Sequence, residues 1–224
     1  MIRIIIVCEG QTEREFCRDV LGPWLLRRGV IAQYPIIKHT GGGIVKWERL
    51  KQQLEHHLKS EKSAYVTTFI DFYGITERHK FPGFGQLPGE NTLKRVARIQ
   101  EAMNADLEEA IRYRFLPYIQ LYEFEALLFS NVGVIFDNFS AEEMTDSEEL
   151  NRIVAAFHNP EEINNSYETA PSKRLSKIIV GYNKVIYGAM LAEEIGLETI
   201  MDRCPGFKNW VDRILTLATV VQEE

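Results

Sequence analysis

An apolar run near the start of the chain constrains the fold more than any other sequence feature. Residues 2–8 (IRIIIVC) are almost all apolar and mostly β-branched, which is typical of a central strand in a parallel sheet that is covered on both faces. A stretch with helical spacing follows at 11–28, where Thr12 and Glu15 have the spacing of a capping box. A buried strand followed by a helix predicts the α/β class, with parallel strands joined by right-handed crossovers.

The same alternation continues to about residue 121 and then changes. The further strands are expected at 31–38, 64–72 and 115–121, and the further helices at 45–61 and 92–114. The residues from 122 onward have mostly helical patterns, at 122–130, 140–157, 171–181, 183–195 and 205–221. We therefore expect an α/β core over 1–130 and a helical region over 131–224 that packs on it, or a single domain that includes both.

The connections between these elements differ in length and composition. His39 to Gly43 (HTGGG) is expected to be a flexible connector, and 74–91 is a long loop that contains two prolines and four glycines. The stretch 159–170 is rich in Asn and Glu and is the weakest candidate boundary within the helical part.

Several classes of protein are excluded by composition. No apolar run approaches the ~20 residues that a membrane helix needs. We expect no signal peptide, because Met1 leads directly into the first predicted strand. Cys8, Cys17 and Cys204 are odd in number and widely spaced, which indicates reduced, buried thiols in a cytoplasmic protein. The chain also lacks a GxxxxGK[ST] phosphate loop, so it is not an ATPase of that type.

The net charge of −6 at first argues against nucleic acid as a partner. However, residues 139–170 carry eight acidic and only one basic side chain, while residues 1–62 carry eleven basic and seven acidic ones. The excess of acid is therefore local, and the basic first third of the chain remains a candidate surface for a polyanion.

Carboxylates follow two of the expected strands directly. Glu9 and Gly10 come after the first strand, Glu13 lies in the first turn of the next helix, and Asp71 ends the third strand. Ligand sites of parallel sheets lie beyond the carboxyl ends of the strands, and Mg²⁺ is bound by one or two carboxylates. Gly10 allows a sharp turn and close approach of another group. The alternatives are that Glu13 complements the helix dipole and that Asp71 caps the following loop.

Two later clusters also carry candidate functional residues. Glu123 and Glu125 follow the fourth strand; both reach one site if this stretch is extended, and only one does if it is helical. Lys173 and Arg174 lie in the first turn of a helix that begins at Pro171, where cations oppose the helix dipole. This placement indicates an anionic ligand, and the alternative is two exposed side chains with no ligand.

Together these segments resemble the domain of unknown function 4276 (DUF4276) family, which is regarded as Toprim-like and related to the nuclease domains of the OLD (overcoming lysogenization defect) group. The resemblance rests on VCEGQTE at 7–13, FIDFYG at 69–74, YEFEALLFS at 122–130, PSKRL at 171–175 and IGL…CPGF…W at 195–210. It implies a Toprim-like parallel sheet of about four strands, flanked by helices, with Mg²⁺- or Mn²⁺-dependent chemistry on phosphodiester bonds.

The resemblance also implies roles for individual residues. Glu9 matches the Toprim glutamate, Glu9 with Glu13 matches the ExxxE form of the OLD group, and Asp71 matches the first aspartate of the DxD motif. Lys173 matches the basic residue placed beside the scissile phosphate. The chain departs from the pattern at Tyr73, which stands where the second aspartate is expected. A phenol is a poor Mg²⁺ ligand at neutral pH, so one expected metal ligand is missing. Either Glu123 or Glu125 supplies it, or the site binds a single ion, or the protein has lost catalysis.

Three hypotheses about function follow from these residues. The first is a Mg²⁺- or Mn²⁺-dependent nuclease or other phosphodiesterase that acts with a separately encoded ABC- or AAA-type ATPase in defence against phage or foreign DNA. In it, Glu9, Glu13 and Asp71 hold the metal, and Gly10, Lys173 and Arg174 contact the substrate. The second is a catalytically inactive binding or regulatory subunit of an ATPase complex, which Tyr73 favours. The third is an enzyme that hydrolyses nucleotides. The type of nucleic acid and the oligomeric state are left open by the sequence.

Overall fold

A parallel sheet forms the centre of the protein, in a computed structural model that describes residues 1–38, 43–164 and 167–220. Its strands are β1 (Ile2–Cys8), β2 (Val30–Gln33), β3 (Ala64–Asp71), β4 (Phe115–Leu116) and β5 (Ile119–Gln120). The order is β2-β1-β3-β4, with β5 also paired to β3, and every pairing is parallel. The predicted α/β fold, with a parallel sheet flanked by helices and a helical C-terminal part, is confirmed.

The central strand β1 is buried on both sides because its side chains alternate between two apolar cores. Ile4 and Ile6 point into the core beneath the first helix, whereas Ile5 and Val7 point into the core beneath α3 and α4. This alternation explains why the whole run is apolar: each face of the sheet is covered by helices.

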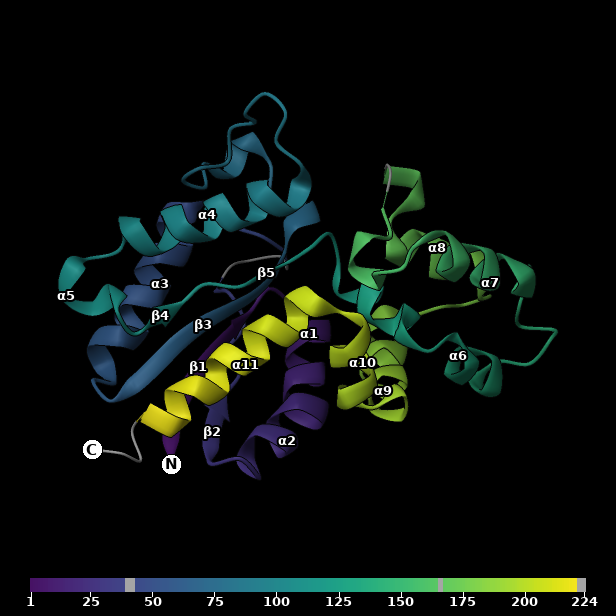
Figure 1. The fold of residues 1–224 in the computed structure, drawn as a ribbon, viewed down its shortest axis with the longest axis horizontal. Coiled ribbons are helices and arrows are strands. Elements are labelled where there is room, and N and C mark those ends of the chain that lie inside the picture. Colours follow the sequence, from purple (N-terminus) through teal and green to yellow (C-terminus); the bar gives the residue numbers. More distant parts are fainter. Residues whose placement is uncertain (39–42, 165–166, 221–224) are drawn as a thin grey trace.

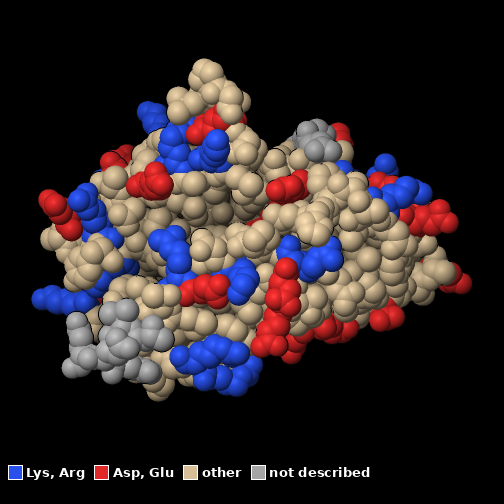
Figure 2. All heavy atoms as spheres, in the orientation of Figure 1, with Lys and Arg blue, Asp and Glu red and all other residues tan. Residues whose placement is uncertain are grey.

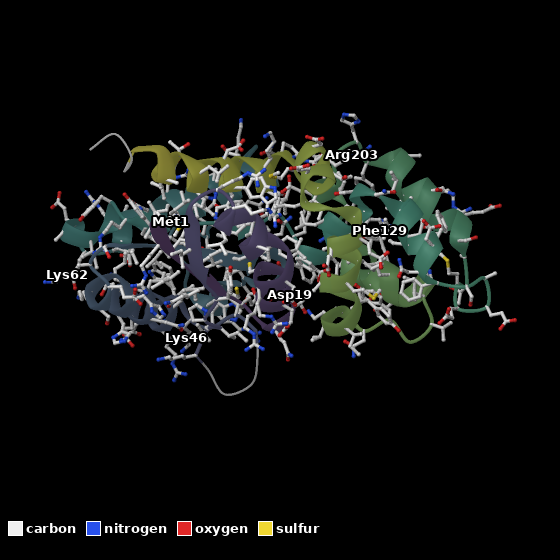
Figure 3. The ribbon with its side chains drawn as sticks, turned by 90° about the horizontal axis from the view of Figure 1, so that it is seen from below. Met1, Asp19, Lys46, Lys62, Phe129 and Arg203 are labelled. Atoms are coloured by element: carbon white, nitrogen blue, oxygen red, sulfur yellow. The ribbon has the colours of Figure 1, made fainter. Side chains whose placement is uncertain are left out.

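The helices form two layers around the sheet (Figure 1). α3 (Trp47–Ser60) and α4 (Thr92–Asp106) cover one face. The other face is covered by the first helix of the chain and by α11 (Pro205–Val220), which runs across the front of the sheet in Figure 1. Figure 3, seen from below, has Asp19 of this first helix between the sheet and the helical half that contains Phe129.

The first helix is continuous but changes its hydrogen-bonding period. α1 (Gln11–Phe16) passes into a π-helical segment, Cys17–Leu21, and then into α2 (Gly22–Leu26). The N–H of Gly22 donates to the carbonyl of Cys17, five residues earlier, just before Pro23, which has no N–H to donate. The predicted capping box of Thr12 and Glu15 is wrong, because Gly10 is the N-cap and the Glu13 side chain accepts from its N–H at 2.8 Å.

The predicted fourth strand is divided into β4 and β5. Pro117, which cannot donate a ladder hydrogen bond, separates them together with Tyr118. The buried side chain of Thr68 replaces the ladder at this point, since its hydroxyl accepts from Tyr118 N at 3.0 Å and donates to Tyr118 O at 2.7 Å. The helix predicted at 92–114 likewise ends early, at Asp106, and a short helix α5 (Glu109–Arg112) follows it.

The C-terminal half contains more helices than the sequence pattern predicts. α6 and α10 fall outside the expected ranges, and 124–130 is a 3₁₀ helix. The helical elements of this half before α11 are η4 (Phe124–Ser130), α6 (Val132–Asn138), α7 (Ser147–Ala156), the 3₁₀ helices η5 (Pro160–Glu162) and η6 (Tyr167–Thr169), α8 (Pro171–Ile178), α9 (Lys184–Ile195) and α10 (Leu197–Arg203). Most of the predicted 39–43 connector, and residues 165 and 166 of the stretch 159–170, lie outside the described residues.

One buried core contains residues from both sides of position 130. Phe207 and Trp210 of α11 pack against Phe69 of β3, and the Trp210 ring stacks on Tyr118 with centroids 4.4 Å apart. Trp210 Nε1 also donates to Thr67 Oγ1 at 2.9 Å. The division into a core over 1–130 and a helical region over 131–224 stays a prediction. The contacts of Phe207 and Trp210 join residues on the two sides of that division.

Two further expectations concern the cysteines and the membrane. Cys8, Cys17 and Cys204 are all buried and free, as predicted. Within the described ranges, the helices are too short or too polar to span a bilayer.

Candidate functional site

Four carboxylates gather beyond the carboxyl ends of the strands. Glu9 directly follows β1, Asp71 is the last residue of β3, Glu13 lies in the first turn of α1, and Glu125 lies in η4 just after β5. Because β1, β3 and β5 are parallel neighbours, their ends meet at one edge of the sheet. The structure therefore brings together the acids that the sequence places far apart, and we call these four residues the acidic cluster.

Backbone N–H groups hold three of these carboxylates in place. Glu9 Oε2 accepts from the N–H of Asp71 at 2.9 Å, which joins the ends of the two central strands. Glu13 Oε2 accepts from the N–H of Gly10, and Asp71 Oδ1 accepts from the N–H of Phe124 at 3.0 Å. The contacts of Glu9 and Asp71 each use one oxygen of the carboxylate, so the second oxygen of each remains as a potential ligand atom.

Burial raises the pKa of every member of the acidic cluster, and repulsion from other carboxylates raises it further for Glu9, Asp71 and Glu125. Burial, with the charge of Glu13 next in size, raises the pKa of Glu9 to about 7. Burial also raises the pKa of Glu125 to about 7 and raises the pKa of Glu13. The pKa of Asp71 lies well above its usual range, because of burial and then the charges of Glu13 and Glu9. Such shifts concentrate at functional sites.

Lys184 is a cation of this site that is not among the residues predicted from the sequence. It lies in the first turn of α9, with Nζ 4.0 Å from Glu125 Oε1. Burial alone would lower the pKa of Lys184, but the charges of Glu125 and Glu13 outweigh that effect and raise it. A lysine in a first helical turn opposes the helix dipole, so the signal used for Lys173 and Arg174 was also present at Lys184.

Tyr182 is a second residue at this site that is not among those predicted from the sequence. Its hydroxyl is buried, and no partner for it is found among the described residues. Burial, followed by the charges of Glu125 and Glu123, raises the pKa of Tyr182. The phenol is therefore a neutral O–H group at the border of the acidic cluster.

Glu123 and Glu125 lie in different surroundings. The sequence left open whether one or both of them reach the site. Glu123 is extended and lies just before η4, and its Oε2 accepts from the N–H of Ser172 at the start of α8, at 3.0 Å. Glu125 is 1% exposed, and its Oε1 has no hydrogen-bond partner among the described residues. The turn between the strand and these acids depends on Tyr122, which has a φ of 66°, a region that residues other than glycine rarely adopt.

The predicted substrate-binding residues lie in different surroundings. Lys173 is exposed on α8, and its predicted place beside a phosphate stays a prediction. Arg174 is explained without an anionic ligand, because its Nε donates to the carbonyl of Thr169 at 2.8 Å and its Nη1 lies 3.6 Å from Glu149 Oε1.

Two glycines allow the close approach of backbone and carboxylate. Gly10 has extended backbone angles that any residue adopts, but a Cβ there would lie 3.3 Å from Glu13 Oε2. A Cβ at Gly74 would lie 3.3 Å from Glu9 Oε1. Tyr73, which stands at the place of the second motif aspartate, is in the short 3₁₀ helix η2 (Phe72–Gly74) that follows β3.

The donor atoms of the acidic cluster fit a hard divalent cation in kind. Mg²⁺ and Mn²⁺ prefer carboxylate oxygens. The buried Oε1 of Glu125 accepts no hydrogen bond among the described residues and has Lys184 Nζ 4.0 Å away, so it is an atom that a cation would satisfy. In the part of the chain that the structure describes, however, no three His, Cys, Asp or Glu side chains lie close enough together to form a metal site as they stand.

The fold and site define an α/β protein with an acidic cluster at the carboxyl edge of its sheet. The model of the family described as domain of unknown function (DUF4276) matches residues 8–215. The chain belongs to this family. No match is found among curated proteins or among solved structures.

Proposed function

We propose that this protein is a Mg²⁺- or Mn²⁺-dependent phosphodiesterase of the Toprim type that acts on nucleic acid. The observation that carries the proposal is the acidic cluster, in which acids from three separate segments meet at the ligand edge of a parallel sheet. Glu9, Glu13, Asp71 and Glu125 would hold the ion. A bound ion would lower the pKa of a water nucleophile and neutralise charge that develops on a phosphate.

The residues of the chain contribute positioning and charge balance. The N–H groups of Asp71, Gly10 and Phe124 orient the carboxylates of Glu9, Glu13 and Asp71 before any ligand arrives. Lys184 offsets part of the negative charge, so a phosphate can approach a site that would otherwise repel it. Lys173, exposed at the start of α8, is the proposed contact to the scissile phosphate.

The family resemblance extends the proposal to partners and setting. Related OLD-type domains work with ATPases, and this chain has no phosphate loop of its own. We therefore propose a separately encoded ABC- or AAA-type ATPase as a partner, a cytoplasmic location, and a role in defence against phage or foreign DNA.

The test of the enzyme proposal is a cleavage assay with matched variants. The purified protein is incubated with plasmid, single-stranded DNA and RNA in Mg²⁺ and then in Mn²⁺. We expect metal-dependent cleavage that Glu9→Gln and Asp71→Asn abolish. Glu15→Gln is the control, because it makes the same chemical change in α1, where Glu15 pairs with Arg14 and Arg18. Absence of cleavage by the wild type with every substrate and both metals, or equal cleavage by the Asp71→Asn variant, would reject the proposal.

Two observations favour a second candidate, a binding or regulatory subunit of an ATPase complex. No three acids are positioned to hold an ion as they stand within the described ranges, and Tyr73 replaces one motif aspartate. Titration calorimetry separates the two candidates. Heat from millimolar Mg²⁺ or Mn²⁺ that is lost in Asp71→Asn supports the enzyme, and no heat supports the binding subunit.

A further inference from the structure

Three segments of the chain lie around Glu9 at the carboxyl edge of the sheet. They are residues 36–38 after β2, residues 43–49 at the start of α3, and residues 74–80 after β3. We call them the framing segments. They belong to the edge of the sheet at which the acidic cluster lies.

Contacts at Glu9 bring the framing segments together. The N–H of Ile37 donates to the carbonyl of Cys8 at 2.9 Å, directly before Glu9. A Cβ at Gly74 would lie 3.3 Å from Glu9 Oε1 and 3.4 Å from Ile44 Cγ2. The framing segments therefore lie directly beside a member of the acidic cluster.

The start of α3 and the end of the third framing segment also lie side by side. The rings of Trp47 and Phe81 are both buried, with centroids 5.5 Å apart. Lys46 and Lys80 directly precede these two residues in the chain, and both lysines are exposed. The two lysines therefore leave the backbone at neighbouring positions beside the acidic cluster.

The framing segments are basic, and their cations have no carboxylate partners. They contain five lysine and arginine residues against two acidic ones, Glu48 and Glu77. All five cations are exposed, and no carboxylate among the described residues forms an ion pair with any of them. The five are Lys38, Lys46, Arg49, Arg78 and Lys80.

The rest of the surface that can be compared is more mixed. Over most of the face drawn in Figure 2, Lys and Arg are interspersed with Asp and Glu, and acidic side chains gather on the helical half of the protein. A polyanion would meet repulsion as well as attraction there. The framing segments are therefore the better candidate for the basic surface that the first third of the sequence indicates.

The fold does not explain three of these cations. Lys46 is the N-cap of α3 and Arg49 lies in its first turn, where a cation opposes the helix dipole. Lys80 has a φ of 54°, in the left-handed region that glycine adopts more readily. Uncharged residues would be at least as stable at these positions, so an anionic ligand explains the cations better than the fold does.

The framing segments offer charge but little aromatic surface. Trp47, Phe72 and Phe81 are buried, and Tyr73 is partly buried. Proteins that bind single strands stack bases on accessible aromatic rings, whereas duplex binding depends mainly on lysine and arginine contacts to phosphates. The chemistry of these segments therefore fits the backbone of a duplex better than the bases of a single strand.

We infer that the framing segments bind the phosphate backbone of double-stranded nucleic acid next to the acidic cluster. The inference rests on the proposed function for what happens at the cluster, but the binding itself is testable without catalysis. It narrows the substrate to duplexes and places them on the side of the cluster formed by Glu9, the start of α3 and the segment after β3.

The test is fluorescence anisotropy in EDTA, which prevents metal-dependent cleavage. The probes are two short labelled DNA duplexes of unrelated sequence and one single strand from the first duplex. Both duplexes should bind alike, and more tightly than the single strand. Lys46→Ala and Lys80→Ala should each weaken binding to the two duplexes equally, and should each reduce the slope of log K against log salt by about 0.9.

Lys62→Ala provides the matched control. Lys62 is exposed and forms no ion pair with a described carboxylate. It follows the other end of α3 and lies apart from Lys46 in Figure 3. This variant should bind both duplexes as the wild type does, with the same dependence on salt.

Several results would overturn the inference. They are no binding of either duplex, tighter binding of the single strand, a salt slope that neither Lys46→Ala nor Lys80→Ala changes, or equal weakening by Lys62→Ala. Binding that follows the expected pattern without any cleavage in Mg²⁺ or Mn²⁺ would support the inference and reject the hydrolase. Metal-dependent cleavage together with wild-type binding by Lys46→Ala and Lys80→Ala would support the hydrolase and reject the inference.

Discussion

Replacing Glu125 by glutamine is expected to stabilise the protein at high pH. The side chain is 1% exposed, and burial raises its pKa from 4.5 to about 7, with the attraction of Lys184 already included. A carboxyl whose pKa is higher in the folded state contributes stability below its unfolded pKa and loses that contribution as the pH rises through the folded value. At about 1.4 kcal/mol per pKa unit, this loss reaches about 3 kcal/mol at pH 8 and stays below about 1 kcal/mol at pH 5.

The Glu125→Gln variant keeps the size of the side chain but has no proton to lose. Its free energy of unfolding should therefore exceed that of the wild type by about 3 kcal/mol at pH 8 and differ much less at pH 5. Urea unfolding in EDTA at the two pH values measures this difference. Glu142→Gln, the same change at an exposed position, should not alter the pH dependence. A Glu125→Gln variant that is less stable than the wild type at pH 8, or equally stabilised at both values, would refute the electrostatic reasoning.

Three further changes test the surroundings of the site and the core. Lys184→Met removes the cation 4.0 Å from Glu125 and should lower stability by on the order of 1 kcal/mol at pH 8, with a smaller effect at pH 5 when urea unfolding is compared. Thr68→Val leaves the buried N–H and carbonyl of Tyr118 without the hydroxyl that joins them, and should cost about 1–3 kcal/mol in urea. Gly206→Ala places a Cβ 2.8 Å from Glu161 Oε1, and should lower the thermal midpoint through a loss of about 1–3 kcal/mol. An unchanged midpoint would show that Glu161 moves away freely.

The parts of the site that depend on sheet topology could be predicted from the sequence. Glu9 and Asp71 end buried strands, and the strands had to be parallel because helices separate them. Their meeting at one edge follows from that topology alone. Asp71 N also donates a hydrogen bond to Glu9 Oε2. This contact depends on the register of β1 against β3, which the sequence pattern does not specify.

The parts that depend on local backbone angles or on distant packing could not be predicted. Whether Glu123 or Glu125 faces the acidic cluster is decided by the left-handed backbone of Tyr122 and the 3₁₀ helix that follows. Lys184 reaches the site because α9 packs against α1, a contact between segments far apart in the chain. The division of the fourth strand depends on Thr68, whose hydroxyl takes over two backbone partners.

The charges of the acidic cluster are not explained by the needs of the fold. The N–H groups of Asp71, Gly10 and Phe124 each require one acceptor oxygen, and an amide oxygen would serve as well as a carboxylate oxygen. Ionised carboxylates add repulsion and desolvation, which their raised pKa values express. A fold that retains these charges at a cost in stability, at the edge where parallel sheets bind ligands, has the charge distribution expected of a site for a cationic ligand. A bound divalent ion would remove the repulsion and make the same residues stabilising. The pH dependence of the free energy of unfolding and the effect of added Mg²⁺ on it would then both measure the repulsion among these carboxylates.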